Sequence, residues 1–104
     1  MLRSVEQRRV PGSQVDPRVT ELRSAVARLR RRLAAYPVDF RDRSIAEEEL
    51  AALAALAAGD HPDVPALRRS LLLIAGAIGS VSALGQGVRE LREAVDLFGR
   101  APRG

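Results

Sequence analysis

The feature that most constrains this fold is a stripe of apolar residues whose spacing alternates between three and four positions. That spacing places six apolar side chains on one face of a helix. Asp16 can cap the first turn and Pro17 suits the first helical position, whereas Pro37 disfavours helical backbone at the residue before it. The sequence therefore predicts an amphipathic helix over residues 17–36. The stripe consists of Val19, Leu22, Val26, Leu29, Leu33 and Tyr36.

A second helix is predicted over residues 44–58. Ser44 and Glu47 have the spacing of a capping box, in which each side chain satisfies a backbone amide near the other. Gly59 follows the segment, and glycine commonly ends a helix. The pattern predicts a short helix whose inner face is formed by leucine and alanine.

A third helical pattern runs over residues 64–98, after the N-cap residue Asp63. A straight helix of this length would span about 50 Å, whereas a compact domain of this size has a diameter of about 33 Å. We therefore expect one of two arrangements. Either the helix kinks or breaks near residues 85–87, which include Gly85 and Gly87, or it overhangs and a second subunit covers it.

The composition agrees with an all-α fold. Apolar residues make up 46% of the chain but aromatic residues only 3%, so the core must be built mainly from leucine, valine, isoleucine and alanine. We expect a three- to four-helix bundle with a long, glycine-interrupted C-terminal helix, completed by dimerisation. We expect the single domain to cover residues 16–99, with residues 1–15 as a flexible arm because they lack periodicity, and residues 100–104 as a tail.

The segment from Ser70 to Val88 contains no charged residue and is apolar on every face over residues 71–79. It is too short and too polar to span a membrane. A helix that is apolar on all sides is usually surrounded by other helices, which favours a homodimer centred on this segment. The alternative is that the other helices of the same chain cover it. The predicted interface consists of Leu71, Ile74, Ala75, Ile78, Gly79, Val81 and Leu84.

Arginines crowd the non-core face of the first helix and suggest a surface for an anionic partner. Nucleic acid is disfavoured, because no aromatic residues interleave the arginines and no nucleic-acid-binding motif is present. The favoured interpretation is a solvated face whose arginines pair partly with Glu47–Glu49, or with Glu90, Glu93 and Asp96 of the last helix. The face consists of Arg23, Arg28, Arg30, Arg31 and Arg32.

No catalytic, cofactor or metal site is expected. The chain has no cysteine, which excludes a disulfide framework and thiolate chemistry. The single histidine, His61, lies between Asp60 and Asp63 in a proline-bounded turn, and we interpret it as an exposed turn residue. The first nine residues lack the apolar region of a secretory signal, so a cytoplasmic protein is expected.

Three segments together resemble a family of small uncharacterised actinobacterial helical proteins, over about residues 17–99. They are the arginine-rich first helix, residues 45–50 (IAEEEL) and residues 67–84 (LRRSLLLIAGAIGSVSAL). The resemblance implies a bacterial lineage and no assigned activity.

Three functions remain open, and none of them is enzymatic. The first is an interaction or assembly protein that self-associates or docks on a larger protein partner. The alternative is a nucleic-acid-associated protein that uses the arginine-rich first helix. The third is a protein that binds membrane surfaces through its apolar segment and the flanking arginines.

Overall fold

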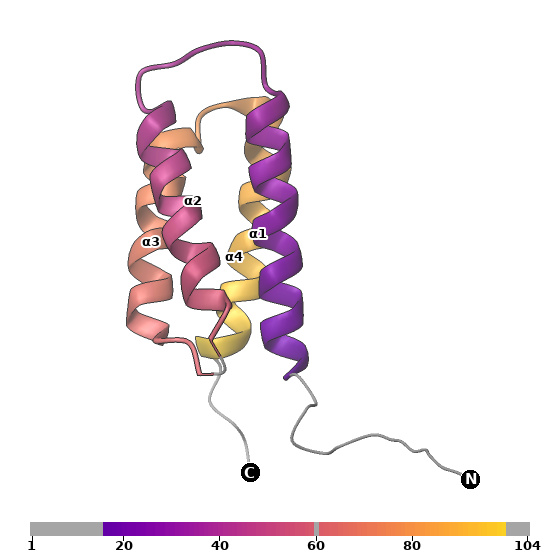
Figure 1. The fold of residues 1–104 in the computed structure, drawn as a ribbon. Coiled ribbons are helices and arrows are strands. Elements are labelled where there is room, and N and C mark those ends of the chain that lie inside the picture. Colours follow the sequence, from indigo (N-terminus) through magenta and orange to yellow (C-terminus); the bar gives the residue numbers. More distant parts are fainter. Residues whose placement is uncertain (1–15, 60, 100–104) are drawn as a thin grey trace, which may run out of the picture.

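The computed structural model describes residues 16–59 and 61–99. The predicted arm at residues 1–15 and the predicted tail at residues 100–104 lie outside this range. Four α-helices and one short 3-10 helix make up the described part, which contains no strand, and the predicted all-α bundle is confirmed (Figure 1). The helices are α1 (Pro17–Ala35), α2 (Arg43–Ala57), α3 (Val64–Ile78) and α4 (Gly85–Gly99), with the 3-10 helix η2 (Ser82–Leu84) before α4.

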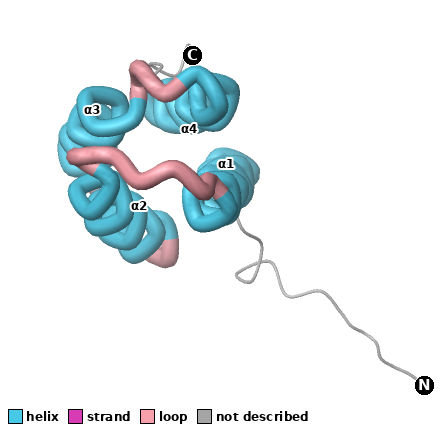
Figure 2. The backbone as a smooth tube through the Cα atoms, turned by 90° about the horizontal axis from the view of Figure 1, so that it is seen from above, coloured by secondary structure: helices cyan, strands magenta, loops and turns pink. Residues whose placement is uncertain are grey.

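The four helices run alternately up and down and form an antiparallel bundle. Each helix packs against the one before and the one after it in the sequence, and α4 closes the arrangement by packing on α1. Seen along its axis, the bundle is a ring of helices around one core (Figure 2). Short connections between antiparallel neighbours are typical of this architecture.

The start and end of α1 follow from its sequence. The Asp16 carboxylate accepts a hydrogen bond from the backbone N–H of Arg18 at 2.9 Å, so Asp16 is the N-cap as predicted. Tyr36 takes extended backbone before Pro37 and is the C-cap. Five of the six residues of the apolar stripe are buried, and Tyr36 is half-buried at the end of the helix.

Aliphatic side chains from all four helices and from η2 fill the core. Because almost no aromatic residue is present, leucine supplies most of the buried volume, and each fully buried leucine stabilises the fold by about 1.5–3 kcal/mol. The largest side chains with less than 2% exposure include Leu22, Leu29, Leu33, Leu50, Leu53, Leu67, Ile74, Ile78, Leu84 and Leu91.

The long third helix does break, but not where the glycine pair predicted. Helix α3 ends at Ile78, and Val81 takes extended backbone before η2. A Cβ at Gly79 would collide with the carbonyl oxygen of Ala75, so the chain uses glycine at the residue that ends α3. The prediction of a break near residues 85–87 is therefore wrong in position.

Gly87 has a packing role instead. It is buried inside α4, where a Cβ would lie 2.7 Å from the Cδ1 atom of Leu29 on α1. Its missing side chain lets α1 and α4 approach each other closely. A packing glycine and a helix-breaking glycine cannot be told apart from spacing alone, which explains the misplaced break.

The predicted capping box at Ser44 is also wrong. Helix α2 begins one residue earlier, at Arg43, and its N-cap residue Asp42 makes no side-chain capping hydrogen bond. Glu47 accepts a hydrogen bond from the Nε atom of Arg43 at 3.2 Å rather than reaching back to a capping amide. An ion pair one turn along the helix takes the place of the box.

None of the described helices has the length and apolar content needed to cross a bilayer.

Candidate functional site

The predicted dimer interface lies mostly inside the chain's own core. Ile74 and Ile78 are 0% exposed and Leu84 is 1% exposed, and Leu71 is buried beside them. Ala75 and Val81 are partly buried against the same core, and Gly79 is exposed. The assignment of Leu71, Ile74, Ile78 and Leu84 to a surface contact is therefore corrected, because helices of their own chain already cover these side chains.

The opposite side of α3 carries the exposed apolar residues. Leu72 is 73% exposed and Leu73 is 45% exposed. Helical periodicity places both away from Leu71 and Ile74, and Gly76 lies one turn further along on the same side. The sequence signal was the absence of polar residues on any face over residues 71–79, but it could not tell which face stays uncovered. We call Arg69, Leu72, Leu73 and Gly76 the α3 outer face.

The five predicted arginines do not form one free surface. Arg23 donates hydrogen bonds from Nε to the carbonyl oxygen of Ala57 at 2.6 Å and from Nη2 to that of Ala58 at 3.1 Å. It therefore satisfies carbonyl groups at the C-terminus of α2, where a positive charge also suits the helix dipole.

Arg28 and Arg32 pair with α4. The Nε atom of Arg28 lies 3.3 Å from Oε1 of Glu90, and the Nη1 atom of Arg32 lies 3.9 Å from the same oxygen. Arg28 also lies 4.0 Å from Glu21. The expected pairing with acids of the last helix is thus confirmed for Glu90. Glu47 pairs with Arg43 and with none of the five arginines of this face.

Two of the five predicted arginines remain. Arg30 and Arg31 are exposed, and within residues 16–59 and 61–99 neither forms an ion pair. The predicted anionic-partner face is thereby reduced to two adjacent side chains.

The hydrogen bond from Gln86 and the ion pairs with arginine make the contribution of Glu90 to stability depend on pH. The pKa of Glu90 is lowered from its usual value of 4.5, mainly by the hydrogen bond from Gln86. Desolvation opposes this, and Arg28 and Arg32 lower the pKa further. A lowered carboxyl pKa stabilises the fold above the unfolded value and loses that effect as pH falls through the folded value.

We therefore expect Glu90→Gln to lower the melting temperature at neutral pH, and the difference from the parent to shrink as pH falls below 4.5. Thermal unfolding followed by circular dichroism over a pH series measures this. Glu93→Gln is the matched control on the same helix, since Glu93 is exposed and makes no ion pair in the described part of the chain. A difference for Glu90→Gln that does not change with pH would contradict the expectation.

Arg43 has a structural role that could not be recognised in the sequence. Its Nη1 atom donates to the carbonyl oxygens of Tyr36 at 2.8 Å and Val38 at 3.1 Å, and its Nη2 atom donates to that of Leu33. The side chain is only 18% exposed. One guanidinium at the start of α2 thus donates hydrogen bonds to three carbonyl groups at and just after the end of α1. In the sequence, Arg43 is one of many arginines, and nothing local marks it.

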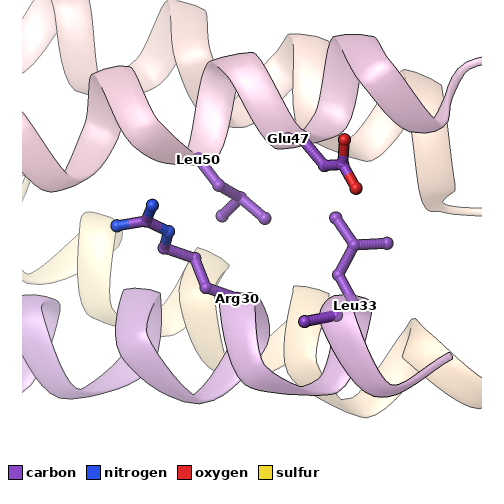
Figure 3. A pocket seen from close by; sticks show the side chains of 5 residues that line it. Arg30, Leu33, Glu47 and Leu50 are labelled. Carbon is purple, nitrogen blue, oxygen red and sulfur yellow. The ribbon is translucent and has the colours of Figure 1, made fainter.

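A hollow of about 270 Å³ lies between α1 and α2 (Figure 3). Arg30 and Leu33 point into it from α1, and Glu47 and Leu50 point into it from α2. Both leucines are at most 2% exposed, so they offer little apolar contact area to a ligand. A ligand pocket needs accessible apolar walls as well as convergent polar groups, and this hollow lacks such walls.

The described residues include no cluster of side chains suited to binding a metal ion. His61 is exposed, and no group of three or more histidine, cysteine or acidic residues among them is arranged to hold a metal ion.

The geometry defines an antiparallel four-helix bundle protein whose most exposed large apolar residue, Leu72, lies beside the exposed Leu73 on the outer face of α3. The chain belongs to DUF5955, a family of unknown function, whose model matches residues 11–99. The resemblance to an uncharacterised family is thereby confirmed. No curated protein and no solved structure matches the chain.

Proposed function

We propose that this protein is a non-enzymatic interaction or assembly protein that binds another protein chain through the α3 outer face. The observation that carries the proposal is the exposure of Leu72 and Leu73, at 73% and 45%. Two large adjacent apolar side chains left in water mark a contact surface, because burying each of them would be favourable by about 1.5–3 kcal/mol.

The surroundings of these leucines support the proposal. Arg69 lies one turn before them on the same side of α3, and Glu48 is exposed on the neighbouring helix α2. An apolar centre with a charged rim is the usual anatomy of a protein–protein interface. Self-association is the form of binding that the sequence favours, although through other side chains than those first expected.

Nucleic-acid binding is the weaker candidate. Arg30 and Arg31 are exposed and make no ion pair within the described residues, which favours some affinity for anions. However, Arg23, Arg28 and Arg32 already bind carbonyl or carboxylate oxygens of their own chain. Each phosphate contact contributes only a part of nucleic-acid affinity, and two arginines supply few such contacts.

Site-specific photo-cross-linking in living cells tests the proposal. A photoreactive phenylalanine analogue replaces Leu72 in one variant and Val38 in another, because Val38 is an exposed apolar residue of the connection between α1 and α2, at 56% exposure. We expect protein cross-links, including cross-links to a second copy, from position 72 and far fewer from position 38. Equal yields at both positions, or none at position 72, would contradict the proposal. Cross-links to nucleic acid from position 31 would favour the weaker candidate.

A further inference from the structure

We draw no further inference here: the strongest candidate, the exposed apolar surface around Leu72 and Leu73 on the α3 outer face, carries nothing beyond the proposed function, because nothing in the structure shows what covers it.

Discussion

Replacing Ile74 by alanine should lower the free energy of unfolding by about 2–5 kcal/mol, whatever the protein concentration. Ile74 is 0% exposed and lies in the core of the single chain, so its truncation removes apolar contacts and leaves a cavity. Small domains have a total stability of about 5–15 kcal/mol, and the variant should therefore unfold at much lower denaturant concentration than the parent.

Urea unfolding at two protein concentrations measures this loss. The experiment uses the Leu72→Glu background, in which self-association should not contribute to stability. Val38→Ala in the same background is the control, with an expected change within about 0.5 kcal/mol because Val38 is 56% exposed. If Ile74→Ala lowered the free energy of unfolding only at high protein concentration, Ile74 would instead lie at an interface between chains.

Arg43→Met should cost about 2–3 kcal/mol, an unusually large effect for a charged residue near the surface. The substitution keeps much of the aliphatic stem but removes the donors for the carbonyl oxygens of Leu33, Tyr36 and Val38. Hydrogen bonds from charged groups stabilise more than neutral ones, and acceptors left without a partner are costly in a half-buried place. Lysine should restore only part of the loss, because it lacks the planar fork of donors.

The matched control is Arg41→Met, two residues earlier, which removes the same charge from an exposed side chain. It should change stability by no more than about 0.5 kcal/mol. Glu47→Gln separates the ion pair from the carbonyl contacts, and since Glu47 is 54% exposed we expect a small change. If Arg41→Met were as destabilising as Arg43→Met, loss of charge rather than of the carbonyl contacts would be the cause.

The parts of the fold that could be predicted are those encoded locally. The apolar stripe of α1 predicted its buried face, and Asp16 and Asp63 were recognised as N-caps whose side chains accept backbone hydrogen bonds. These features depend on residues within one or two turns of each other, so spacing alone reveals them.

The errors arose where distant contacts decide the local structure. Gly87 looks like a helix breaker until Leu29 of α1 is seen to pack against it. Ser44 looks like a cap until the α2 start is seen to be held by Arg43 and its contacts with the end of α1. The apolar segment of α3 suggested a second chain because the sequence could not show how the other helices of the same chain are placed. It therefore could not show that they cover most of this segment.

That some apolar side chains of α3 stay exposed could be predicted, but not which ones. A segment that is apolar on all faces leaves one of them outside the core of its own helices, and Leu72 and Leu73 belong to that face. Which of its faces turns outward depends on how α3 is rotated in the bundle, and that rotation is determined by packing against α2 and α4.

The contacts of Arg23 and Arg43 are reciprocal, and this has a consequence for folding. Arg23 of α1 satisfies the carbonyl groups at the end of α2, and Arg43 of α2 satisfies those at the end of α1. Neither C-terminus can be completed until the other helix has docked beside it. The α1–α2 hairpin should therefore form as one cooperative unit, whose two helices gain their last turns together rather than one after the other.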